Sequence, residues 1–105
     1  MEKLEGYLEK KGVWGKWKTV YVKLEGSELK IFSRHDARKP KQSITINDTV
    51  VQDAERLTKK QYSFGIFGKS KQFVFFQCKS KEEVDRWIRA IQVRTGINII
   101  YWSTD

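Results

Sequence analysis

One amphipathic stretch near the C-terminal end of the sequence constrains the fold more than any other feature. Apolar residues recur there at the i, i+3, i+4 and i+7 spacing of a single helix face: Val84, Trp87, Ile88 and Ile91. Ser80 precedes them, and Glu83 follows Ser80 by three residues, which is the spacing of a capping box. The sequence therefore predicts a helix over residues 80–93 with one side to bury.

Short segments separated by turn residues fill the chain before this helix. Period-2 alternation or β-branched and aromatic enrichment predicts strands at residues 4–10, 17–24, 29–33, 43–46, 50–53, 62–67 and 72–78. A polar loop with room for one helical turn follows the fifth strand. No other helix is available to cover the open side of such a sheet, so Trp87 is expected to plug it. This pattern predicts a mainly β fold with one C-terminal α-helix.

Length and composition predict one domain over residues 1–105. Residues 96–105 form a C-terminal extension. Its apolar part, Ile97 to Trp102, could be an eighth strand, a segment packed along the barrel, or the start of something removed. No apolar run approaches the ~18 residues of a membrane span, and no leader pattern is present. The single cysteine, Cys78, lies within an aromatic strand, which favours a buried, inert thiol in a reducing compartment.

The charge balance is strongly basic. Twenty-one Lys and Arg residues against 13 Asp and Glu give a net charge of +8. Such a charge attracts nucleic acid, anionic lipid headgroups or acidic proteins without choosing among them. Alternation places Lys10 at the end of the inner face of the first strand and Lys18 at the start of that of the second. The two lysines are therefore expected to flank the same hairpin mouth.

Catalytic and metal-binding patterns are absent from the sequence. His35 is the only histidine, and no cysteine pair accompanies it, so no zinc site or Cys-His or Ser-His arrangement is recognisable. No phosphate-binding or dinucleotide-binding glycine pattern is present either. We therefore expect no enzyme, no metal and no cofactor. Nucleic acid is a poor partner, because the aromatic residues of the late strands are needed in the core rather than as a stacking platform.

The whole pattern resembles the pleckstrin homology (PH) domain over about residues 4–95. The residues that carry the resemblance are Gly6-x-Leu8-x-Lys10, Trp17-Lys18-x-x-Tyr21-Val22-x-Leu24, Leu29 to Phe32, Pro40, Ile44 and the Trp87 helix. The resemblance implies a seven-stranded, partly open barrel of two near-orthogonal antiparallel sheets, capped by the helix. It also implies structural roles for Gly6, Leu8 and Trp87.

In the lipid-binding members of this family, an inositol phosphate headgroup binds at the open end opposite the helix, among the loops after the first, third and sixth strands. The resemblance implies ligand-binding roles for Lys10, Lys18, Lys30, Arg34 and Lys41. A supporting basic patch is expected from Lys11, Lys16, Arg38, Lys39, Lys69 and Lys71. Val20 stands where the strongest binders carry an arginine, and a valine offers no donor, so modest selectivity is implied. An outer-face site near Lys16 and Trp17 is the alternative that the family permits.

The tip of the first hairpin carries Val13 and Trp14 between two glycines. A tryptophan there favours either shallow membrane insertion or packing across the loop. The resemblance as a whole implies a monomeric, cytoplasmic signalling module that binds phosphoinositides or other anionic lipids peripherally at the membrane. The alternative is a protein-interaction or autoinhibitory domain whose basic mouth faces an acidic protein partner.

Overall fold

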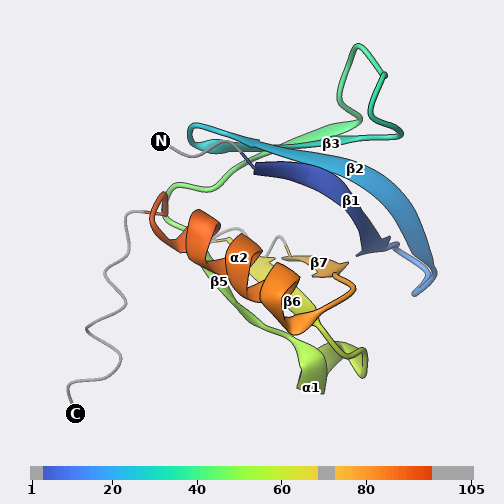
Figure 1. The fold of residues 1–105 in the computed structure, drawn as a ribbon, viewed down its shortest axis with the longest axis vertical. Coiled ribbons are helices and arrows are strands. Elements are labelled where there is room, and N and C mark those ends of the chain that lie inside the picture. The colour runs from blue at the N-terminus through green and yellow to red at the C-terminus, as the bar shows by residue number, and fades with distance from the viewer. Residues whose placement is uncertain (1–3, 69–72, 96–105) are drawn as a thin grey trace.

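A computed structural model of the chain describes residues 4–68 and 73–95. Its elements are β1 (Leu4–Lys11), β2 (Trp17–Glu25), β3 (Glu28–Phe32), β4 (Gln42–Thr45), β5 (Val50–Asp53), α1 (Glu55–Thr58), β6 (Ser63–Phe67), β7 (Phe73–Gln77) and α2 (Lys81–Gln92). The seven expected strands and the closing helix are confirmed (Figure 1). The single helical turn expected after the fifth strand is α1. The C-terminal extension at residues 96–105 lies outside the described residues.

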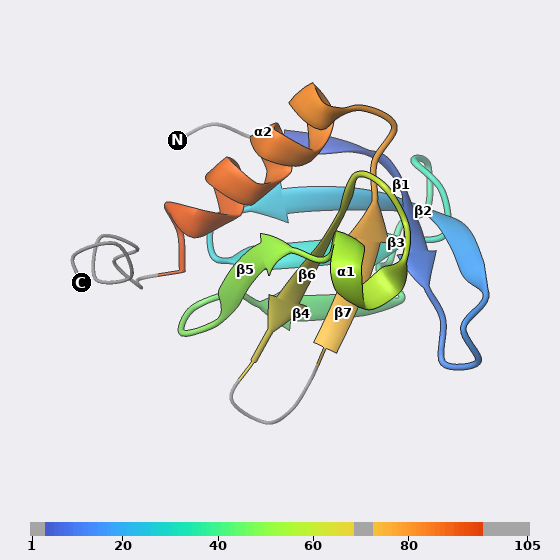
Figure 2. The same ribbon diagram turned by 90° about the horizontal axis from the view of Figure 1, so that it is seen from below.

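The seven strands form one antiparallel ribbon in the order β4-β3-β2-β1-β7-β6-β5. It folds into two layers, β1–β4 and β5–β7, whose strands run in clearly different directions (Figure 2). Only two residue pairs join β1 to β7, Glu9 with Gln77 and Lys10 with Phe76. The two end strands, β4 and β5, are not paired with each other. This is the partly open barrel of two sheets that the family resemblance implies.

Helix α2 closes the barrel by packing against β5 and β6. Its buried residues are Val84, Trp87, Ala90 and Ile91, and Trp87 is only 2% exposed. The Ser80 hydroxyl accepts a hydrogen bond from the Glu83 amide at 3.1 Å, as a helix cap should. The Glu83 carboxylate instead accepts from the Lys79 amide at 2.7 Å, one residue before the expected partner. The predicted plug is therefore confirmed.

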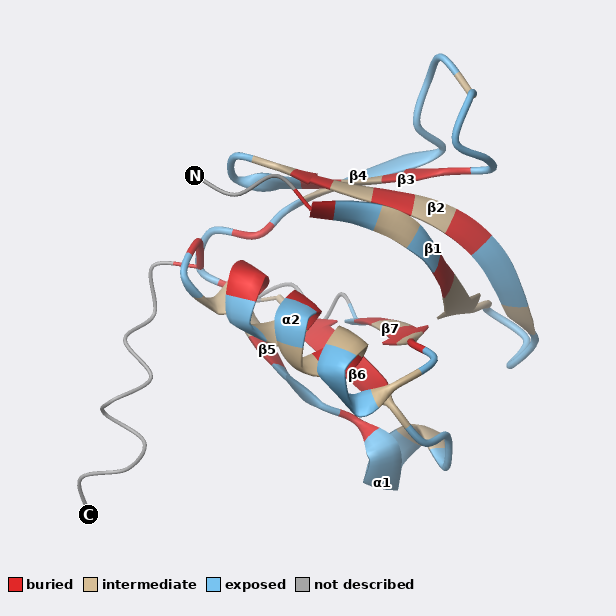
Figure 3. Ribbon diagram, viewed as in Figure 1, coloured by how far each residue is buried: buried red, intermediate tan, exposed pale blue. Residues whose placement is uncertain are grey.

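Alternating burial along the strands separates the inside of the barrel from its surface (Figure 3). Leu8, Val22, Leu24 and Ile31 face inward from the first layer, and Phe64, Ile66 and Phe76 face them from the second. Burial of this apolar surface is the main source of folding free energy. Within the described residues, neither helix is long and apolar enough to cross a bilayer.

The glycines that matter for packing differ from the expected one. A side chain built on Gly6 would meet no atom within 4 Å, so no steric contact in the structure requires glycine there. At Gly65 the same atom would lie 2.9 Å from the rings of both Phe67 and Phe75. The close approach of aromatic rings in the second layer therefore depends on Gly65, which the sequence pattern did not single out.

Candidate anion-binding site

The β1–β2 hairpin places Lys10 directly opposite Lys18. The Gly12 amide donates to the Lys16 carbonyl at 2.7 Å, and an added side chain on Gly12 would lie 2.9 Å from that oxygen. Gly15 has a φ of 82°, in the left-handed region where glycine is favoured. These two glycines shape the tip and hold the strands in register. The predicted convergence of Lys10 and Lys18 at one hairpin mouth is therefore confirmed.

A cavity of about 490 Å³ opens beside this hairpin. Its lining residues are Lys10, Gly12, Val13, Lys18, Thr19, Val20, Ile31, Ser33, Lys41 and Gln42. The Lys41 amide donates to the Ile31 carbonyl at 2.7 Å, which brings the residues at the start of β4 alongside the end of β3. The lining therefore combines three lysines with several neutral residues, and no acidic residue is among them. One of the neutral residues, Thr19, donates its hydroxyl hydrogen to the carboxylate of Glu9, which is not part of the lining.

Val20 has two roles in this arrangement. It is only 6% exposed and belongs to the hydrophobic core, yet it also borders the cavity. A valine side chain contributes no hydrogen bond, so the wall between the lysines is apolar at this point. Any phosphate bound in the cavity would be held by lysines, which act as mobile point charges rather than planar forks.

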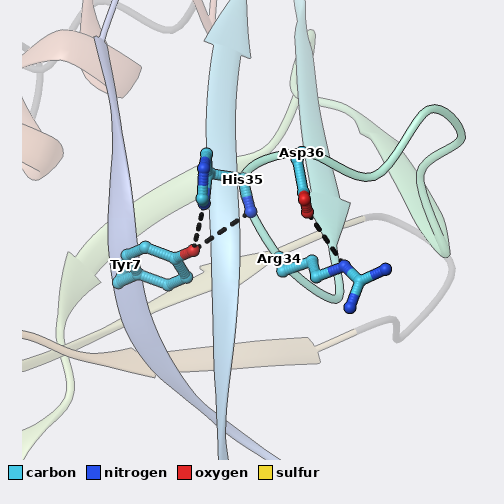
Figure 4. A network of polar contacts seen from close by, with 4 residues as sticks. All are labelled: Tyr7, Arg34, His35 and Asp36. Carbon is cyan, nitrogen blue, oxygen red and sulfur yellow. Dashed lines mark hydrogen bonds and ion pairs between the residues drawn. The ribbon is translucent and has the colours of Figure 1, made fainter.

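The start of the loop from β3 to β4 is held on the outer face of the first layer. The Tyr7 hydroxyl and His35 Nδ1 share a hydrogen bond of 2.8 Å, and the His35 amide donates to the same hydroxyl at 3.1 Å (Figure 4). Arg34 Nε lies 2.9 Å from Asp36 Oδ1, with both side chains exposed. Arg34 therefore already has an anionic partner and does not line the cavity.

The remaining predicted basic residues are distributed around the molecule. Lys30 pairs with Glu25 at 3.1 Å and lies between the inward-facing Leu29 and Ile31, so it faces away from the cavity. The Lys11 ammonium group lies 5.6 Å from the centre of the Phe75 ring. Exposed cations on the loops do not line the cavity: Lys16, Arg38 and Lys39. Lys69 and Lys71 lie outside the described residues.

The structure thus brings together three of the five predicted ligand residues, Lys10, Lys18 and Lys41. It adds Ser33, Thr19 and Gln42 as neutral lining residues that the sequence analysis did not identify. Such residues carry no sequence signal of their own, because they become neighbours only when β2, β3 and β4 pair.

Val13 and Trp14 project from the hairpin tip into solvent. Their exposed fractions are 94% and 92%. The expected alternative, an indole packed across the loop, is not what the structure shows. Exposure of two adjacent apolar side chains costs free energy in water, which makes the tip suited to contact with an apolar phase.

Two groups away from the cavity have raised pKa values. The Tyr21 hydroxyl donates to Glu5 at 2.6 Å, and this hydrogen bond, with desolvation, raises the pKa of Tyr21 to about 12. Burial, followed by the charge of Glu83, raises the pKa of the Cys78 thiol to about 12. The described residues contain no cluster of three or more metal-ligating side chains.

Comparison with known proteins agrees with this fold. The family model described as PH domain matches residues 2–95. The chain belongs to the PH domain family. A sequence search of curated proteins finds no match. Among solved structures, the solution structure of a pleckstrin homology domain is 30% identical to this PH domain, with a TM-score of 0.77. That match covers 87% of this chain and 82% of the other.

Two further structures are similar to this PH domain. The C-terminal PH domain of pleckstrin, crystallised with D-myo-Ins(1,2,3,4,5)P5, is 25% identical with a TM-score of 0.77, covering 88% of this chain and 96% of that chain. The PH domain of human oxysterol binding protein-related protein 11 is 19% identical with a TM-score of 0.80, covering 90% of this chain and 81% of that chain. At 19% identity, the match to the oxysterol binding protein-related protein shows a shared fold and nothing further.

Proposed function

We propose that this PH domain is a non-catalytic, monomeric membrane-targeting module that binds phosphoinositide headgroups in the cavity beside the β1–β2 hairpin. The observation that carries the proposal is the presence of Lys10, Lys18 and Lys41 around one cavity with no carboxylate in its lining. The inositol phosphate bound to the similar PH domain of pleckstrin supports the same ligand class.

The lysines determine both the strength and the limits of this binding. Each charge-assisted hydrogen bond to a phosphate contributes about 1.5–3 kcal/mol, so a headgroup with several phosphates binds better than a monophosphate. A lysine does not impose the planar, bidentate geometry of an arginine, and Val20 supplies no donor. Binding is therefore expected to discriminate modestly among isomers and to weaken as salt increases.

The exposed hairpin tip supplies the apolar part of the contact. Val13 and Trp14 lie beyond the cavity lysines on the same hairpin, so a headgroup in the cavity brings both side chains close to the bilayer. A tryptophan is stable at the boundary between headgroups and acyl chains. Exposed Lys16 next to them adds attraction to anionic lipid. We propose peripheral membrane binding from the cytoplasm, as part of signalling recruitment.

Co-sedimentation with vesicles tests this function. Vesicles containing each phosphoinositide are compared with phosphatidylserine vesicles of equal charge, and a soluble inositol polyphosphate is added as competitor. Lys10→Ala and Lys18→Ala should each weaken headgroup binding by about 1.5–3 kcal/mol. Lys30→Ala is the matched control: it removes the same charge from a lysine paired with Glu25 outside the cavity, and should have a much smaller effect.

Three results would refute the headgroup site. Equal losses in Lys10→Ala and Lys30→Ala would show attraction by net charge rather than binding in the cavity. Absence of binding to every anionic vesicle would instead favour the acidic protein partner. Loss of binding in Lys16→Ala with Lys10→Ala silent would move the site to the outer side of the hairpin.

A further inference from the structure

The segment between β5 and β6 contains two residues in the left-handed backbone conformation, which residues other than glycine rarely adopt. Lys59 has a φ of 64° and Tyr62 a φ of 62°, and neither is a glycine. Lys59 ends the single turn of α1 in this left-handed conformation, a position where glycine is the usual residue. Such conformations persist only where surrounding contacts impose them, and they concentrate at functional surfaces.

Side-chain hydrogen bonds impose this conformation. The Glu55 carboxylate accepts from the Tyr62 amide at 2.7 Å and so closes the segment across its base. The Thr58 and Ser63 hydroxyls share a hydrogen bond of 2.7 Å, and Ser63 also donates to the Lys60 carbonyl at 2.8 Å. These hydrogen bonds therefore hold the backbone of the segment in one conformation, from which its outward-pointing side chains extend into solvent.

The exposed side chains of this segment include one leucine and three cations, together with Glu55 and Gln61. Leu57 is 61% exposed although it is a large apolar residue. Arg56, Lys59 and Lys60 around it are also exposed. The acidic residue within the turn, Glu55, is engaged with the backbone as described above. An exposed leucine surrounded by cations has the composition of a surface that meets an anionic bilayer.

This segment lies beside the hairpin that carries Trp14. The Lys60 ammonium group is 6.0 Å from the centre of the Trp17 ring, and Trp17 begins β2, three residues after Trp14. In two perpendicular views, the C-terminal end of α2 points away from the β1–β2 hairpin (Figures 1 and 2). The contact between Lys60 and Trp17 therefore places the segment that carries Leu57 next to the hairpin that carries Trp14.

We propose that Leu57, with Arg56, Lys59 and Lys60, forms a second membrane contact that docks on anionic lipid together with the Trp14 tip. This inference rests on the proposed membrane function and extends it to α1. One inserted tip leaves the barrel free to rotate on the membrane surface, whereas two separated contacts fix its orientation. The cations stay among the headgroups while the leucine enters the boundary with the acyl chains.

A fluorescent label placed at residue 57 tests insertion directly. The native thiol, Cys78, is 5% exposed and its pKa is raised by burial, so it reacts poorly and a label goes to an introduced cysteine. An environment-sensitive dye on the Leu57→Cys variant should shift to the blue on vesicles of phosphatidylcholine, phosphatidylserine and phosphatidylinositol 4,5-bisphosphate. The same dye on Val93→Cys should not shift, because Val93 is 69% exposed but caps the far end of α2.

Binding measurements provide the second test. Leu57→Gln should weaken vesicle binding by roughly 3- to 10-fold, the effect of partly withdrawing one leucine from an apolar phase. Its affinity for a soluble inositol polyphosphate should be unchanged, and Val93→Gln should change neither quantity. Circular dichroism melting of each variant confirms that the fold is retained.

The outcomes separate this inference from the proposed function. If the unsubstituted chain pellets with vesicles while the label at residue 57 stays silent, the second contact is overturned and headgroup binding stands. If the unsubstituted chain does not bind vesicles, both the second contact and the proposed membrane function are refuted. A label that responds to polyglutamate but not to vesicles would assign the segment to an acidic protein and overturn the lipid contact.

Discussion

Replacing Val20 by arginine offers the sharpest test of the cavity, because this residue belongs both to the core and to the cavity wall. Its side chain is 6% exposed and lies on the same strand face as Lys18. An arginine at this position can lay its methylene groups along the wall and extend its guanidinium toward the mouth. The substitution thus exchanges some packing for a planar donor beside two lysines.

The magnitudes follow from the burial of Val20. Loss of its packing, partly replaced by the arginine stem, should lower the free energy of unfolding by about 1–2 kcal/mol. For a domain of this size the melting temperature should fall by about 4–8 °C for each kcal/mol lost. A bidentate guanidinium–phosphate pair contributes about 1.5–3 kcal/mol, so affinity for a soluble inositol polyphosphate should rise about 10- to 100-fold.

Val22→Arg is the matched control for this prediction. Val22 is fully buried on the same face of the same strand, two residues further along, and does not border the cavity. A guanidinium there would be buried without a partner, so Val22→Arg should unfold the domain. Calorimetric titration and thermal melting of both variants separate binding from folding.

Two results would refute the reasoning. A folded Val20→Arg variant with unchanged affinity would show that the headgroup is not held in this cavity. A Val20→Arg variant that unfolds as completely as Val22→Arg would show that the cavity does not admit the longer side chain.

Three further predictions concern other parts of the structure. Trp87→Ala should lower the free energy of unfolding by about 3–5 kcal/mol, measured by chemical denaturation, because it leaves a cavity where the indole of α2 packs in the core. An unchanged denaturation midpoint would contradict this. Trp14→Ala should leave melting and soluble headgroup affinity unchanged and weaken vesicle binding about tenfold, whereas equal losses in both binding assays would contradict insertion. The pKa of Tyr21 is raised to about 12 mainly by its hydrogen bond to Glu5, so the neutral tyrosine is favoured in the folded state. The folded state is fully stabilised by this effect below pH ~10, and the stabilisation is lost as pH rises toward ~12. Glu5→Gln should lower the titration midpoint of Tyr21. An unchanged midpoint would show that the hydrogen bond to Glu5 does not raise this pKa.

The sequence predicted those parts of the fold that depend on local periodicity. The spacing of Val84, Trp87 and Ile91 places them on one helix face whatever the helix packs against, and the structure buries all three. Alternation along the first two strands, with a glycine-bounded turn between them, was likewise sufficient to place Lys10 and Lys18 at one hairpin mouth.

Lys30 shows a limit of reasoning by family resemblance. It was expected among the ligand residues because of its position relative to the family pattern. Yet it lies between Leu29 and Ile31, and alternation sends neighbouring side chains to opposite faces of a sheet. The structure follows the alternation, and Lys30 pairs with Glu25 on the outer face. Here local geometry was the better guide.

Other features were decided by contacts between residues far apart in the chain. Arg34 is kept from the cavity by a loop whose anchor joins Tyr7 to His35, 28 residues later. Lys41 reaches the cavity because its amide bonds to β3. No periodicity encodes either arrangement, since each depends on where a loop returns to the sheet.

The sequence by itself thus determined the strand pattern, the helix plug and the meeting of Lys10 with Lys18, because each arises from backbone geometry within one element or one hairpin. Only the tertiary structure decided which loop cations line the cavity, that Trp14 stays exposed, and that α1 displays Leu57 beside the same hairpin. The physical reason is that a charge or an apolar side chain on a loop acquires its surroundings from the closed barrel. Its own neighbours in the chain do not specify them.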